Sequence, residues 1–191
     1  MKLKQTPSQT AGPFFSTALL HEGWNDLTTR GAIGEIITIT GRVLDGDSAP
    51  VSDALLEIWQ ANAAGRYDHP DDTRDIPLDP HFKGFGRVGT DAQGSFRLRT
   101  IKPGPVPGMG AALQAPHINV SVFARGALRR LVTRIYCPDE PLNAQDPVLN
   151  AVLDAPRRAT LIARPMGRES RSDWHFDIVL QGDNETVFFD I

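Results

Sequence analysis

Five histidines are the side chains of this sequence best suited to bind a metal or move a proton near neutral pH: His21, His69, His81, His117 and His175. Most histidines in a domain of this size are surface or hydrogen-bonded polar residues, so a histidine needs a supporting pattern. The sequence has no Gly-rich phosphate loop, no GxSxG nucleophile motif and no cysteine pair for zinc. These absences argue against the nucleotide-binding, serine-hydrolase and cysteine-zinc classes.

Two strings provide such a pattern, because each places a candidate side chain at the edge of a predicted strand. In EIWQANAAGRYDHPDD, Tyr67 lies just beyond a strand, with Asp68 and His69 beside it. In KPGPVPGMGAALQAPHINVSVF, His117 opens a strand after a loop rich in proline and glycine. These two strings contain the candidate functional residues.

The elements that must position these residues are predicted to be short strands. In EIITITGRVLDGD, residues Ile37, Ile39 and Val43 give a period-two alternation. ALLEIWQAN (54–62) follows after a turn, which suggests a hairpin or a neighbouring pair in a sandwich. Further strand-like runs cover 86–104, 117–126, 128–137, 158–165, 173–183 and 185–191, and only 143–154 predicts a helix.

Eight or nine short strands with one short helix indicate an all-β fold, a β-sandwich with long loops. An open barrel is the competing topology, and the pattern does not separate the two. Residues 1–33 are predicted to be an irregular N-terminal arm that contacts a partner, and residues 34–191 the sandwich domain. The polar segment 63–85 is too long for a plain connector, and such loops are usually functional.

The charge and composition exclude several classes of partner. The formal net charge is −3 and no run of like charges occurs, so we expect neither a nucleic-acid surface nor a membrane anchor. No stretch has the roughly 20 apolar residues of a membrane helix. Cys137 is the only cysteine, and MKLKQTPSQTAGPFF lacks the apolar run of a signal peptide. We therefore expect a cytoplasmic protein.

The strings TPSQTAGPFF, LEIWQAN, TIKPG, APHI and ETVFFDI together resemble the intradiol ring-cleaving dioxygenases over almost the whole chain. In that family two tyrosines and two histidines hold a ferric ion, because anionic phenolates stabilise the trivalent state. The metal-bearing chains have one tyrosine in a GRY-like string, the second in KPGPYP, and the histidines as H-x-H. The resemblance implies cleavage of an aromatic C–C bond by dioxygen.

This sequence keeps only half of that ligand set. The first tyrosine is Tyr67 and the first histidine is His117, but the second positions are Val106, in KPGPVP, and Asn119, in HIN. Valine has no donor atom, and the amide oxygen of asparagine is a poor ligand for ferric iron. We therefore expect no metal and no catalytic residue in this chain, with Tyr67 and His117 held in place by packing and hydrogen bonds.

The departure resembles the metal-free α chain of those family members that pair it with a homologous, iron-bearing β chain. The resemblance implies that the partner binds Fe(III), that the substrates are protocatechuate and dioxygen, and that the α chain lines the substrate pocket. Carried over by motif, the lining residues are Thr10, Gly12 and Pro13 of the arm, and Arg125 in FARG. Arg125 would place a positive charge near an anionic substrate.

Two other interpretations remain open at this stage. The chain could be a non-catalytic β-sandwich binding module, which the absence of a neighbouring iron-bearing chain would favour. It could also be a self-sufficient enzyme whose metal recruits Asp68 or His69 beside Tyr67. The iron content of the purified chain tests this last interpretation.

Overall fold

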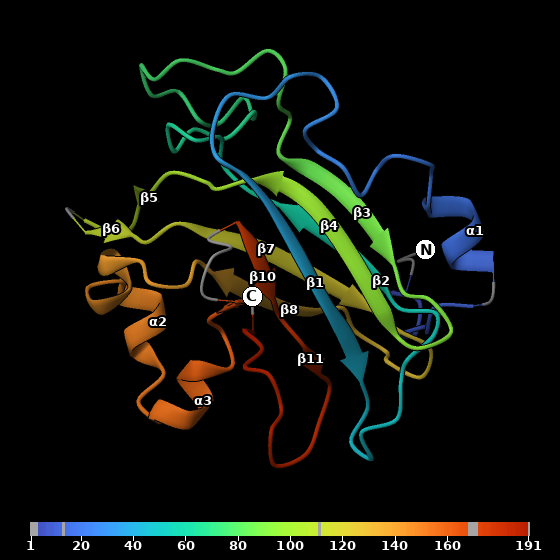
Figure 1. The fold of residues 1–191 in the computed structure, drawn as a ribbon. Coiled ribbons are helices and arrows are strands. Elements are labelled where there is room, and N and C mark those ends of the chain that lie inside the picture. Colours follow the sequence, from blue (N-terminus) through green and yellow to red (C-terminus); the bar gives the residue numbers. More distant parts are fainter. Residues whose placement is uncertain (1–3, 13, 111, 168–171, 191) are drawn as a thin grey trace.

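The computed structural model describes residues 4–12, 14–110, 112–167 and 172–190. Within these ranges the chain forms two face-to-face sheets, shown in Figure 1. The first sheet contains β1 (Ile36–Leu44), β4 (Ser95–Ile101), β9 (Arg164–Pro165), β10 (Asp173–His175) and β11 (Ile178–Val179). The second contains β2 (Leu55–Trp59), β3 (Phe85–Gly89), β7 (His117–Phe123) and β8 (Leu131–Tyr136). The β-sandwich expected from the sequence is confirmed.

The order of strands differs from the simplest interpretation of the sequence. In the first sheet β1 pairs antiparallel with β4 and parallel with β10 and β11. In the second sheet the order is β3-β2-β7-β8, and every pair is antiparallel. The two strands expected to pair across the turn at 46–50 are β1 and β2, and that pairing is wrong, because the turn carries the chain from one sheet to the other.

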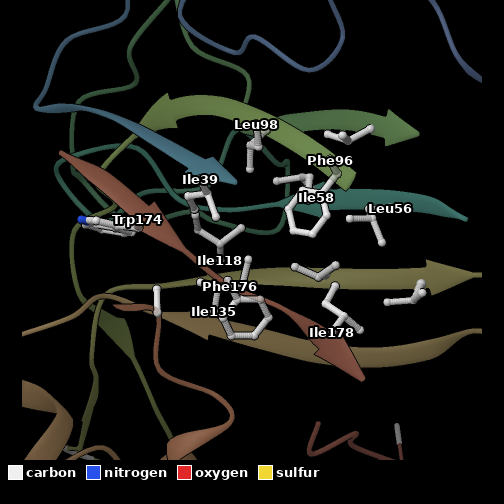
Figure 2. Packing of buried hydrophobic residues seen from close by; sticks show 14 of the residues in the cluster. Ile39, Leu56, Ile58, Phe96, Leu98, Ile118, Ile135, Trp174, Phe176 and Ile178 are labelled. Carbon is white, nitrogen blue, oxygen red and sulfur yellow. The ribbon is translucent and has the colours of Figure 1, made fainter. Parts of the chain in front are cut away.

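The core lies between the two sheets, as the alternation predicted. Figure 2 shows Ile39 and Leu98 from the first sheet facing Ile58, Ile118 and Ile135 from the second. Apolar residues at alternate positions of β1, β2, β4 and β7 are fully buried and form this cluster. Because successive side chains of a strand point to opposite faces, the residues between them are left on the outer faces of the sandwich.

The helices are short and lie outside the sandwich. They are α1 (Phe14–Leu19), α2 (Pro147–Ala151), α3 (Ala155–Ala159) and the 3-10 turn η1 (Pro141–Ala144). The helix predicted over 143–154 corresponds to α2, whereas α1 and α3 were not expected. Figure 1 shows α2 and α3 on the same side of the molecule as the hairpin of β5 (Val106–Pro107) and β6 (Leu113–Gln114), with α1 on the opposite side. In the described part of the chain, no helix has both the length and the apolar character of a membrane span.

Candidate functional site

The residues singled out in the sequence gather at the two ends of β7. His117 and Asn119 lie at its beginning, and Arg125 follows its end. At about 3.3 Å per residue, the length of β7 separates the two ends by roughly 20 Å. The candidates therefore form two sites. We call Tyr67, Val106, His117 and Asn119 the half-site, and the region of Thr10, Gly12 and Arg125 the arm site.

Two glycines bring Tyr67 and Val106 to the same cleft. Gly65 has a φ of 79°, in the left-handed region, and a Cβ there would lie 2.1 Å from the Pro105 carbonyl oxygen. A Cβ at Gly104 would lie 2.5 Å from the Gly65 nitrogen. Without side chains at these points the two loops touch, and Tyr67 and Val106 both line an open cleft of about 740 Å³.

Tyr67 is held on three sides. Its ring stacks on Trp59, with centroids 5.5 Å apart and planes at 15°. Its backbone N–H donates to Asp72 at 2.9 Å, and hydrogen bonds from Arg74 hold the pKa of Asp72 at about 2, so the anchoring carboxylate stays charged. Burial raises the pKa of the Tyr67 hydroxyl, which therefore stays protonated at neutral pH.

His117 is buried and neutral. The residue is only 3% exposed, and its Nδ1 lies 2.8 Å from the Ala115 carbonyl oxygen. Because a carbonyl only accepts, Nδ1 carries the proton and Nε2 is the unprotonated nitrogen. Burial, with a smaller contribution from the charge of Arg134, lowers the pKa of His117 to about 4.

The other two positions do not complete a ferric site. Val106 is buried and has no donor atom. The Asn119 amide nitrogen donates to the Trp59 carbonyl at 3.3 Å and to the Tyr67 hydroxyl at 3.5 Å. The amide N–H group, rather than its oxygen, is therefore directed at the phenol. Within the described ranges, no group of three or more His, Cys, Asp or Glu side chains is arranged to hold a metal. The half-site residues do not fit Fe(III).

At the arm site, the N-terminal arm lies against the turn that follows β7. The Thr10 hydroxyl accepts a hydrogen bond from the Gly126 N–H at 2.8 Å, and Phe15 contacts Phe123 with ring centroids 5.5 Å apart. Thr10 and Gly12 line a hollow of about 370 Å³ between the arm and this turn. A Cβ at Gly12 would meet nothing within 4 Å, so this chain alone leaves open space there. Pro13 lies outside the described residues.

Two arginines line the same hollow, and Arg125 is not one of them. The Arg125 guanidinium pairs with the Asp53 carboxylate, and its side chain is 63% exposed. Arg129 and Arg130 line the hollow and are exposed. Sequence reasoning singled out only Arg125, although the three arginines fall within residues 125–130. It missed Asp53, because nothing in the local sequence indicates that contact.

The sequence matches the family model described as Dioxygenase over residues 10–182. It is 45% identical to the protocatechuate 3,4-dioxygenase alpha chain of Burkholderia cepacia, over 99% of this chain and 98% of that one. It is also 45% identical to the beta chain from the same organism, but over 81% of this chain and 68% of that one. Among solved structures, the dioxygenase domain of a carbohydrate-binding fusion protein from Streptomyces sp. SirexAA-E aligns with a TM-score of 0.64 and 32% identity, covering 94% and 99% of the two chains.

Proposed function

Because this chain belongs to the intradiol dioxygenase family, we propose that it is the metal-free α subunit of a protocatechuate 3,4-dioxygenase. Such an enzyme uses dioxygen to cleave protocatechuate to 3-carboxy-cis,cis-muconate in aromatic catabolism. In this proposal a homologous β chain would bind Fe(III), which would supply activation of the catechol substrate there. The α chain completes the substrate pocket, and the assembly acts in the cytoplasm.

One observation carries the proposal: near full-length similarity to an alpha chain coincides with the loss of two ligand positions. Val106 offers no donor, and the Asn119 amide is committed to hydrogen bonds with Trp59 and Tyr67. The similarity to a beta chain spans a smaller share of both proteins. The same extent of similarity to the alpha chain disfavours the alternative of a non-catalytic β-sandwich binding module.

The arm site is the part of this chain that we propose to contact the substrate. Thr10, Gly12 and Pro13 would form one wall, where the open space beside Gly12 allows a neighbouring chain or an aromatic ring to approach its backbone. Arg125 would supply positive charge for the substrate carboxylate. Its exposure and its single carboxylate partner, Asp53, leave part of the guanidinium fork available for a further acceptor.

The arm would also bind the partner chain. Phe14 is 81% exposed at the start of α1, an unusual position for a large apolar side chain unless a partner covers it. Obligate interfaces typically bury on the order of 2,000–5,000 Å² in total. Removing residues 1–15 should leave the sandwich folded and impair assembly or activity. A fully active complex formed by the truncated chain would exclude a role for the arm.

The direct test is to express the full chain with and without its candidate β partner. We expect the chain alone to contain little iron, to lack the visible absorption of tyrosinate bound to iron, and to cleave no ring. The complex should contain iron and produce carboxymuconate from protocatechuate. A coloured, active preparation of this chain by itself would overturn the proposal and favour a self-sufficient site that recruits Asp68 or His69.

A further inference from the structure

Arg134 lies beside the half-site, opposite Asn119, although no family motif points to it. In the antiparallel pairing of β7 with β8, Arg134 is directly opposite Asn119, and Tyr136 is directly opposite His117. Directly opposed residues of an antiparallel pair point to the same face. Arg134 and Tyr136 therefore lie on the face of the second sheet that carries His117 and Asn119.

The contacts of Arg134 connect it to the rest of the half-site. Its Nη1 donates to the Gln114 side-chain oxygen at 2.6 Å and to the Tyr136 hydroxyl at 3.2 Å. Gln114 is the strand partner of Val106 in the β5–β6 hairpin. Arg134 therefore contacts the residue paired with Val106, which stands where the metal-bearing chains have their second tyrosine.

The remaining half-site positions are connected to Arg134 through its strand neighbour and through its charge. Asn119, the direct neighbour of Arg134 across the strands, donates to the Tyr67 hydroxyl. The charge of Arg134 also opposes the effect of burial on the pKa of Tyr67 and adds to the effect of burial on the pKa of His117. Asn119 is thus the direct strand neighbour of Arg134, and Tyr67, Val106 and His117 are each connected to Arg134 through one intermediate residue.

We propose that Arg134 is the resident cation of the half-site and that its guanidinium excludes a metal ion from it. A guanidinium stays charged at every accessible pH, so its repulsion of a metal cation cannot be relieved by deprotonation. Exclusion of iron would then depend on three positions, Val106, Asn119 and Arg134. This inference follows from the half-site alone and does not depend on the pairing with a β chain.

The proposal predicts that restoring the missing donors does not by itself restore a metal site. The full chain would be prepared as the double variant Val106→Tyr/Asn119→His, and as two triple variants that add Arg134→Gln or Arg134→Lys. Glutamine removes the charge, whereas lysine keeps it and serves as the matched control. Each protein would be titrated with ferric nitrilotriacetate, followed by measurement of bound iron per chain and of the visible tyrosinate-to-iron absorption.

We expect the glutamine triple variant to bind iron at least about tenfold more tightly than the double variant, because a unit positive charge beside the half-site is removed. The lysine variant should resemble the double variant. Equal iron affinity with arginine or glutamine at position 134 would overturn the proposal. So would a glutamine triple variant that has a native circular dichroism spectrum and binds no more iron than the double variant.

A milder pair of variants keeps the test decisive if the tyrosine substitution prevents folding. Asn119→His alone, and combined with Arg134→Gln, would be titrated with Co²⁺, whose visible bands report coordination by imidazole and phenolate. We expect the bands only in the combined variant. Bands of equal strength in both variants, or in neither while both remain folded, would contradict the role of Arg134.

Discussion

Asp146 is a fully buried carboxylate that connects several elements next to the half-site. Its removal should lower the free energy of unfolding more than most single substitutions do. Its Oδ1 accepts from the N–H groups of Val148 and Leu149, at 2.9 and 2.7 Å, which caps α2. The same oxygen accepts from the Tyr136 hydroxyl at 3.1 Å, and Oδ2 accepts from the Ala115 N–H at 2.7 Å. Asp146 thus connects α2, β8 and the segment that leads into His117.

The expected magnitude follows from these four hydrogen bonds. Each net hydrogen bond contributes about 1 kcal/mol, so Asp146→Ala should lower the free energy of unfolding by about 4 kcal/mol. Asp146→Asn should cost about 1–3 kcal/mol, because its amide N–H₂ would face the Ala115 N–H and leave one buried donor unpaired. The matched control is Asp154→Ala at the exposed N-cap of α3, where a single backbone donor predicts a cost of about 1 kcal/mol.

Urea unfolding of the full-length variants at neutral pH and equal chain concentration measures these differences. The slope of the free energy against urea should stay constant across the series, which shows that the unfolded reference has not changed. The reasoning would be refuted if Asp146→Ala cost no more than Asp154→Ala. A large loss in Asp146→Ala with none in Asp146→Asn would instead mean that cavity formation, not hydrogen bonding, determines the effect.

Three further predictions concern the two candidate sites. In the assembled enzyme, Arg125→Ala should raise the apparent Michaelis constant for protocatechuate about tenfold and that for catechol less. High salt should shrink the difference between the two substrates, because the Arg125 side chain is exposed. Equal increases for both substrates would contradict a contact with the carboxylate. Tyr67→Phe should leave turnover nearly normal and cost about 1 kcal/mol of stability, whereas a hundredfold drop in turnover with an intact fold would mean that the half-site is active. The pKa of His117 is about 4 in the folded chain and near 6.5 in the unfolded chain, so the unfolded chain binds a proton first as the pH falls. The free energy of unfolding should therefore be highest above pH 6.5 and fall by up to about 3 kcal/mol as the pH drops to 4. His117→Gln should flatten this dependence in denaturation measured across that range, and an unchanged slope would assign the acid sensitivity to other groups.

The strands were predictable because their apolar residues alternate, but their partners were not. The core-facing side chains are Ile37 and Ile39 in β1 and Leu56 and Ile58 in β2. The same alternation of apolar residues would be seen whether the two strands paired within one sheet or lay in opposite sheets. A short turn between two such strands permits both outcomes. The runs 117–126 and 128–137 were likewise predicted as strands, and β7 and β8, which lie within them, do pair in antiparallel register.

The half-site was predictable only where a local motif marks a residue. Tyr67, Val106, His117 and Asn119 could be assigned because their flanking strings are distinctive. Arg134 could not be assigned, because its place beside the half-site depends on the register that sets it opposite Asn119. Register is a property of two paired strands and is not marked in either strand alone. The pairing of Arg125 with Asp53 likewise joins segments far apart in sequence.

The separation of the two sites along β7 explains how a chain can lose its metal ligands and still serve a partner. Asn119 lies on the outer face of the strand, while Ile118 and Val120 on either side of it are fully buried in the core. A change at Asn119 therefore alters the half-site without disturbing the packing between the sheets. Sites that are well separated and share no partners usually respond independently to substitution. The arm site, roughly 20 Å away at the far end of β7, should therefore keep its geometry when Val106, Asn119 and Arg134 are replaced. The same triple variant that gains iron in the half-site should consequently still assemble with the partner through its arm.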